Sequence, residues 1–286
     1  MGSQFENPYL IKGPAQIAFS GGRSSAYMLY HILDAHEGRL PNSVVISFQN
    51  TGREMPETLD FIEACSKAWN LEIHWVEYAP EFPDKWKYVD YESAARNGEP
   101  FAALVKHKQY LPNPCARFCT AELKVRTAKR FMLAQGFEHW ESILGLRADE
   151  PKRVMRSCGP TRERWINLCP LATAGVSKQQ VAAFWAEQPF DLALPNANGR
   201  TPLGNCDLCF MKSERTLAGI MRDYPERAAW WIDLEETIST TKGKLARFNV
   251  NYTYRELANI VADQGDWLFD EGTDFFCDAS HGGCTD

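Results

Sequence analysis

Hydrophobic and polar residues follow two different periods along the first half of the chain. Short apolar runs typical of buried strands are followed by stretches in which apolar residues recur every three or four positions, as on one face of a helix. The predicted strands are residues 16–20, 44–48, 71–78 and 142–146. Helical spacing connects the first three of them, through Ala26, Leu29, Tyr30 and Leu33 and then through Leu59, Ile62, Cys65 and Trp69.

This alternation of strands and helices predicts an α/β fold, with a parallel sheet and helices on both of its faces. In open sheets of this kind, ligands bind at the carboxyl ends of the strands. Residues 79–118 interrupt the alternation with five prolines, so we expect an irregular insertion there.

The second half of the chain changes character. Helical spacing covers residues 214–222 and 227–237, and the last part of the chain is rich in acidic residues. We therefore assign residues 1–215 to the α/β domain and residues 216–286 to a helical extension with an acidic tail.

Composition and charge narrow the class of protein. The 286 residues are 44% hydrophobic and 24% charged, which is ordinary globular usage. A net charge of −6 argues against a general nucleic-acid coat, but residues 106–164 hold 13 basic and 6 acidic residues and favour an anionic ligand. Because no apolar stretch approaches the roughly 20 residues that span a bilayer and no signal peptide is present, we expect a cytoplasmic protein without a membrane partner.

A glycine turn directly follows the first predicted strand. Glycines let a phosphate approach the backbone, the start of the next helix presents free N–H groups, and serine hydroxyls add donors. The spacing fits neither the Walker phosphate loop nor the GxGxxG dinucleotide turn. The predicted phosphate-binding residues are Ser20, Gly21, Gly22, Arg23, Ser24 and Ser25.

These residues resemble a known superfamily. Residues 20–25 resemble the SGGxDS loop of the N-type ATP pyrophosphatases, the PP-loop superfamily, with Ser24 in place of the aspartate. Residues 50–59 are similar to the TGxxFPET segment of phosphoadenosine phosphosulfate (PAPS) and adenosine phosphosulfate (APS) reductases. The resemblance implies a Rossmann-like PP-loop fold and an adenine nucleotide, held in part by Thr51, Gly52 and Glu57.

Further motifs continue the resemblance in the same order, over about residues 16–215. Residues 119–124 resemble the family's cysteine followed by a basic helix, and residues 145–153 resemble its G-x-R-x-x-E-x-x-R loop after a strand. Arginine's planar fork suits phosphate and sulfate oxygens. The resemblance therefore implies that Lys124, Arg147 and Arg153 bind the anion.

Nine cysteines in a cytosolic chain favour metal binding or catalysis over disulfides. Cys206 and Cys209 form a CxxC motif, and distant cysteines could complete a four-thiolate site when the chain folds. By resemblance to APS reductases, the expected cofactor is a [4Fe–4S] cluster, but zinc and unmetallated thiols remain alternatives. Whether Cys115 or Cys169 supplies a ligand also stays open. The predicted metal ligands are Cys119, Cys169, Cys206 and Cys209.

Cys284 is the predicted catalytic nucleophile, because PAPS reductases carry theirs on a C-terminal tail. Nearby glycines would let the thiol reach a pocket, and His281 could stabilise a thiolate. The negative charge of seven acidic residues in the last part of the chain disfavours a thiolate. The alternative is that Cys277 and Cys284 are an incidental or metal-binding pair.

Three functions follow from these motifs. The first is reduction of PAPS or APS, with a thioredoxin-like reductant as partner. The second is an ATP pyrophosphatase with Mg²⁺, acting as a sulfurtransferase that adenylates a nucleic-acid base, in RNA or DNA, or another acceptor for thiolation. The third is a non-enzymatic protein that senses a nucleotide or a cluster.

Overall fold

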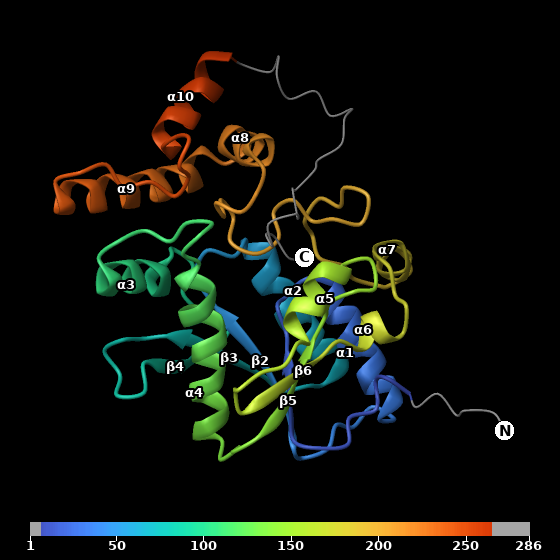
Figure 1. Ribbon diagram of the computed structural model, residues 1–286. Coiled ribbons are helices and arrows are strands. Elements are labelled where there is room, and N and C mark those ends of the chain that lie inside the picture. The colour runs from blue at the N-terminus through green and yellow to red at the C-terminus, as the bar shows by residue number, and fades with distance from the viewer. Residues whose placement is uncertain (1–6, 265–286) are drawn as a thin grey trace.

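The structure is a computed structural model that describes residues 7–264 (Figure 1). Within that range, six strands form one sheet in the order β4-β3-β2-β1-β5-β6. The strands are β1 (Ala15–Ala18), β2 (Val44–Asn50), β3 (Ile73–Tyr78), β4 (Trp86–Val89), β5 (Trp140–Leu144) and β6 (Trp165–Leu168). Neighbouring strands are parallel except β4, which pairs antiparallel with β3 at the sheet edge. The predicted α/β class is confirmed.

Helices cover both faces of the sheet, as predicted: in Figure 1, α4 lies against one face and α1 and α2 lie on the other. The helices are α1 (Arg23–Ala35), α2 (Pro56–Trp69), α3 (Glu99–Lys108), the π-helix η1 (Thr120–Arg126), α4 (Thr127–Ala134), α5 (Pro151–Ser157), α6 (Pro170–Thr173), α7 (Lys178–Ala186), α8 (Glu214–Asp223), α9 (Pro225–Lys242) and α10 (Tyr254–Gln264).

The central strand β1 gives the two faces different character. Ile17 lies opposite Ile46 of β2 and Ile143 of β5, and all three are buried in the main core. Gln16 points to the opposite face because side chains alternate along a strand. The face beneath α4 therefore contains polar positions on β1.

The predicted irregular insertion at residues 79–118 is wrong in two places. Strand β4 adds an edge to the sheet, and α3 begins one residue after Gly98, with Pro100 in its first turn. The prolines do not prevent either element, because Pro100 occupies a position that needs no N–H partner. Sequence analysis also missed β6, a strand of only four residues.

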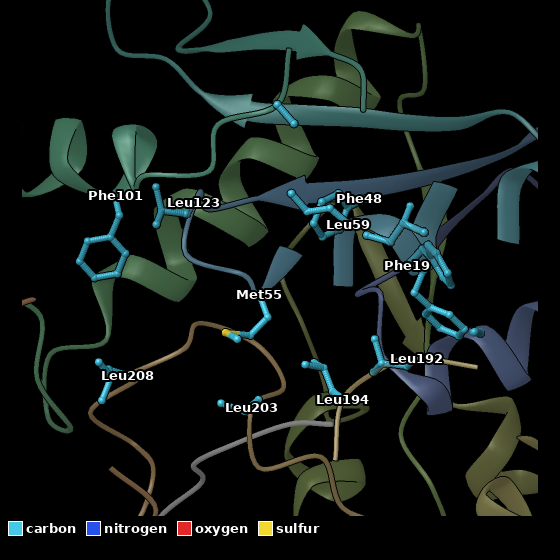
Figure 2. Close-up of a cluster of buried hydrophobic side chains, with 14 of the residues drawn as sticks. Phe19, Phe48, Met55, Leu59, Phe101, Leu123, Leu192, Leu194, Leu203 and Leu208 are labelled. Atoms are coloured by element: carbon cyan, nitrogen blue, oxygen red, sulfur yellow. The ribbon is translucent and has the colours of Figure 1, made fainter. Parts of the chain in front are cut away.

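The long connection between α7 and α8 returns to the sheet. Figure 2 shows Leu192, Leu194 and Leu203 from this connection near Phe19 and Met55, which follow β1 and β2. Burial of these apolar side chains holds the connection over the loops at the carboxyl ends of the strands.

Helices α8, α9 and α10 contact one another and gather at the top of Figure 1. Asp207 links them to the sheet: its buried carboxylate pairs with Arg53 and Arg227 and accepts a hydrogen bond of 2.8 Å from Trp231 Nε1. The acidic tail predicted at the end of the chain lies outside the described residues.

Candidate functional site

Strands β2 to β4 lie on one side of β1, and strands β5 and β6 lie on its other side, so the switch point of the sheet is between β1 and β5. Open α/β sheets bind ligands at such a point. The loops that follow these two strands lie against each other. A Cβ atom at Gly145 would lie 3.0 Å from the Cα atom of Ser25 and 3.1 Å from its backbone nitrogen. Glycine is therefore required here for the close approach of the two loops.

The glycine loop has the geometry of an open helix start. Gly21 has a φ of +75°, and a Cβ atom there would lie 2.7 Å from Thr58 Cγ2 of α2. Gly22 is the N-cap of α1 and supplies no side-chain cap. Ser20 Oγ donates to Ser25 Oγ at 3.0 Å, and Ser25 Oγ donates to the carbonyl of Gly22 at 2.9 Å. The N–H groups at the start of α1 are thus left without a side-chain cap, an arrangement that suits an anion.

Beside this loop lies a cavity of about 350 Å³, here called the sheet cleft, on the face that carries α4. Ser20 and Ser25 line it together with three basic side chains, Lys124 of η1, Lys129 of α4 and Arg153 of α5. Arg153 also contacts Glu150 on the same loop. Four of the predicted phosphate-binding residues therefore meet at one cavity.

The floor of the sheet cleft is a polar row that sequence analysis missed. Gln16, Ser142 and Asn167 are neighbours in register across β1, β5 and β6, and all three line the cavity. Polar side chains in the middle of parallel strands are unusual, because such strands are normally buried on both faces. That departure from apolar character was the available sequence signal.

Two indoles form the far end of the sheet cleft. Trp140 and Trp165 are cross-strand neighbours whose rings stack at a centroid distance of 5.4 Å and an interplanar angle of 17°. The Nε1 atom of Trp140 is buried and has no hydrogen-bond partner. The cleft thus has an aromatic pair at one end, where Lys129 Nζ lies 5.5 Å from the centre of the Trp165 ring, and Lys124 and Arg153 as further basic residues of its lining.

Arg147 and Arg23, also predicted to bind the anion, are placed differently. Arg147 is buried, donates to Ser24 Oγ at 2.7 Å and pairs with Asp149 at 3.0 Å. Arg23 pairs with Asp191 at 2.8 Å and donates to the carbonyl of Leu194. Both guanidinium groups hold loops together, and neither lines the sheet cleft.

The segment that resembles TGxxFPET is also held by hydrogen bonds between its own residues. Glu54 Oε2 accepts hydrogen bonds from the Thr51 N–H at 3.0 Å and the Thr51 hydroxyl at 2.8 Å. Gly52 has a φ of +76° and packs against Gly98, so a Cβ atom at Gly52 would lie only 3.0 Å from the Cα atom of Gly98. Glu57 has a buried Oε2 atom without a partner. Thr51, Gly52 and Glu57 do not line the sheet cleft.

Three cysteines, here called the three-thiol group, lie near Lys124: Cys119, Cys206 and Cys209. Burial raises the pKa of Cys119 to about 11, with a further increase from Cys209 and a decrease from Lys124. Burial likewise raises the pKa of Cys206, and Glu54 adds to the effect while Lys124 opposes it. Cys206 Sγ lies 3.4 Å from Thr51 Oγ1.

Lys124 connects the three-thiol group with the sheet cleft. Its Nζ atom lies 3.9 Å from Glu54 Oε1, and the lysine also lines the cleft. Burial alone would lower the pKa of Lys124, but Glu54 and the three thiols raise it above its usual value. The ammonium group is therefore held in its charged form between the cavity and the cysteines.

The four predicted metal ligands do not come together. Cys169 lies beside Cys158, with 3.2 Å between their sulfur atoms, and apart from the three-thiol group. In the part of the chain that the structure describes, no group of three or more His, Cys, Asp or Glu side chains is arranged to hold a metal ion. This arrangement does not fit a [4Fe–4S] cluster on the predicted set, and we derive no step through one. Cys284 and Cys277 lie outside the described residues.

Comparison with known proteins places the chain in a family. No family model matches the sequence. The chain is 31% identical over 215 residues to the uncharacterized nin region protein ORF290 of Escherichia phage lambda, a match that covers 72% of this chain and 69% of that protein. The chain belongs to the ORF290 family.

Among solved structures, this ORF290 family member is similar to PAPS reductase from Candida auris in its phosphate complex. The TM-score is 0.41 and the sequence identity 20%, over 63% of this chain and 75% of the other. Among the helices of residues 7–264, none combines the length and the apolar character needed to cross a membrane.

Proposed function

We propose that the protein is an enzyme that binds an adenine nucleotide in the sheet cleft. The observation that carries this proposal is the convergence of four different phosphate-binding features at one cavity of about 350 Å³. They are the hydroxyl groups of Ser20 and Ser25, which lie next to the uncapped start of α1, and the charged groups of Lys124 and Arg153. Lys124 and Arg153 also pair with Glu54 and Glu150, but both line the cavity, and together with the two hydroxyl groups they favour a phosphate over a neutral ligand.

The other end of the cleft suits the base. An indole face offers stacking area to a flat aromatic ring. The amide and hydroxyl groups of Gln16, Ser142 and Asn167 offer donors and acceptors along the way. If the phosphates of a nucleotide bind at the glycine loop, its ribose would lie beside these polar groups and its base beside the Trp140–Trp165 pair.

For the reaction, we propose reduction of a sulfonucleotide, PAPS or APS. The thiolate of the predicted nucleophile, Cys284, attacks the sulfur atom of the substrate. The sulfur–oxygen bond to the nucleotide breaks, and adenosine monophosphate or its 3′-phosphate leaves. A dithiol reductant then releases sulfite and becomes a disulfide. Lys124, positioned beside both the cleft and the three-thiol group, would stabilise negative charge on either side of this transfer.

The nucleic-acid acceptor of the adenylation alternative has less support. Much of the positive charge in residues 106–164 is paired within the segment: Lys108, Arg126 and Arg130 surround Glu122, and Lys129 pairs with Glu163. Paired charges attract a phosphate backbone less strongly than free ones. We therefore favour reduction over transfer to RNA or DNA.

Arg153→Ala tests the binding site. Loss of a charged donor should weaken nucleotide binding roughly tenfold to a hundredfold in a calorimetric titration. Lys152→Ala is the matched control, because Lys152 is the exposed neighbour on the same helix and does not line the cleft. Equal affinities of the two variants would contradict the proposed site.

The products then separate the reactions. Sulfite and a nucleotide monophosphate formed from PAPS or APS with a dithiol reductant support reduction. Pyrophosphate released from ATP and Mg²⁺ in the absence of any reaction with PAPS or APS would overturn it in favour of adenylation.

A further inference from the structure

Cys158 and Cys169 form a pair outside the three-thiol group. Cys158 follows the last residue of α5 and is exposed, whereas Cys169 follows the last residue of β6 and is buried. Their sulfur atoms are 3.2 Å apart, and a disulfide bond is about 2.05 Å long. A movement of about 1 Å would therefore bring the two sulfur atoms to bonding distance.

The two thiols are suited to different roles. Burial raises the pKa of Cys169, and Cys158 and Glu150 raise it further, so Cys169 resists ionisation while its neighbour is reduced. Both cysteines line a second cavity of about 760 Å³, and of the two Cys158 is the exposed one. This cavity gives a small thiol reagent access to the exposed sulfur atom.

We propose that Cys158 and Cys169 are a redox-active dithiol that forms a reversible disulfide by exchange with a small disulfide such as oxidised glutathione. The Cys158 thiolate attacks one sulfur of that molecule, forms a mixed disulfide and releases one thiolate. Cys169 then loses its proton, attacks the Cys158 sulfur and displaces the second thiolate. The protein gives up two electrons and two protons, and the glutathione disulfide is reduced to two thiols.

The disulfide would change one wall of the sheet cleft. Arg153 and Ser157 of α5 and Asn167 of β6 line the cleft, and Asn167 Nδ2 donates to the Ser157 carbonyl at 2.7 Å. No residue of α5 is buried, so packing holds this helix weakly. A covalent bond between the residues next to Ser157 and Leu168 would fix α5 against β6. The effect on a nucleotide, unlike the disulfide itself, rests on the proposed function.

Peptide mapping tests the pair in the full-length protein. The reduced protein is equilibrated with oxidised and reduced glutathione, its free thiols are alkylated, and it is digested with trypsin without reductant. We expect peptide 157–162 linked to peptide 165–178, two hydrogen atoms lighter than the two peptides together. Addition of dithiothreitol should restore both free peptides.

The variants identify the sulfur atoms. Cys158→Ser should remove the linked peptides, while Cys115→Ser, which alters another exposed cysteine, should leave them unchanged. Cys169→Ser should stop the reaction at a glutathione adduct on Cys158. If it does not fold, the Cys158→Ser result still decides the pairing. A wild-type protein that stops at the adduct, or that links Cys158 to another cysteine, would overturn the proposal.

Hydrogen exchange then measures the effect on the wall of the cleft. Amides of residues 152–158 should exchange at least several-fold more slowly in the oxidised protein than in the reduced one. Equal rates would refute the proposed fixing of α5. Hydrogen exchange is measured without a nucleotide, so its result does not depend on the proposed function. A negative result in the calorimetric titration would contradict only the nucleotide site.

Discussion

Trp140 has an indole N–H that is buried without a hydrogen-bond partner, although its ring packs well against Trp165. A buried donor without a partner loses its hydrogen bond to water and gains none in return, which costs about 1–3 kcal/mol. Such a cost is expected where the donor serves a ligand. Under the proposed function, a nucleotide bound at the Trp140 end of the sheet cleft would be the partner of this donor.

Trp140→Phe separates the donor from the ring. We expect the nucleotide affinity to fall roughly fivefold to tenfold, because the ring surface remains and one hydrogen bond is lost. The thermal midpoint of the free protein should not decrease by a similar amount, since the lost donor has no partner there. Trp86→Phe is the control: Trp86 Nε1 is also buried without a partner, but it lies outside the cleft. Unchanged affinity in Trp140→Phe would remove the donor from the proposed site.

At the scale of elements, one carboxylate joins α9 to the segment before α10 and to the first residue of α10. Glu235 of α9 is buried and accepts hydrogen bonds from the backbone N–H groups of Phe248 at 2.9 Å and Tyr254 at 2.6 Å. Burial raises the pKa of Glu235 to about 7, although these N–H groups lower it. The carboxyl group therefore titrates near neutral pH in the folded protein.

The raised pKa predicts the direction of a pH effect on stability. The folded state holds the Glu235 proton more tightly than the unfolded state, whose pKa is near 4.5. The free energy of unfolding should therefore fall as pH rises from about 4.5 to 7, by up to about 3 kcal/mol from this group. Urea unfolding at pH 5 and pH 8 measures the change.

Glu235→Gln should flatten this part of the pH profile, because an amide does not titrate in this range. Glu236→Gln, at the exposed neighbouring position, should keep the profile of the parent protein. A profile that is equally steep in both variants would assign the pH dependence to other groups.

At the scale of the whole molecule, Asp207 connects the sheet and the helical extension. Its carboxylate is fully buried and pairs with Arg53, which follows β2, and Arg227 of α9. The guanidinium of Arg53 also lies 4.5 Å from the centre of the Trp230 ring. Removing one member of a buried ion pair leaves the other charge buried and unpaired.

Asp207→Ala should lower the free energy of unfolding by about 3–5 kcal/mol. Asp223→Ala is the surface control: Asp223 forms an exposed pair with Arg222, and its loss should cost less than about 1 kcal/mol. Urea denaturation of both variants checks the difference. Similar losses of stability would mean that the Asp207 cluster does not hold the extension to the sheet.

Features formed by residues close together in the chain could be predicted from the sequence alone. The strand and helix periods predicted the α/β fold, and the glycines and serines of residues 20–25 predicted the position of the loop between β1 and α1. Both are local: a strand period needs five or six residues, and a turn needs four. The missed strands β4 and β6 are as short as β1, but they lie at the two edges of the sheet and are only partly buried, so they lack the apolar run that marks β1.

Partners that are distant in the chain depend on how the elements pack. Cys169 resembled a ligand of the same site as Cys206, but β6 and α5 place it beside Cys158. Arg147 and Arg23 matched an anion-binding pattern, yet nearby carboxylates occupy both. The row of Gln16, Ser142 and Asn167 exists only because three strands pair in one register. Residue type limits the chemistry that a side chain can perform, whereas sheet register and helix packing decide which side chains meet, because contacts such as that of Gln16 with Ser142 join residues more than a hundred positions apart.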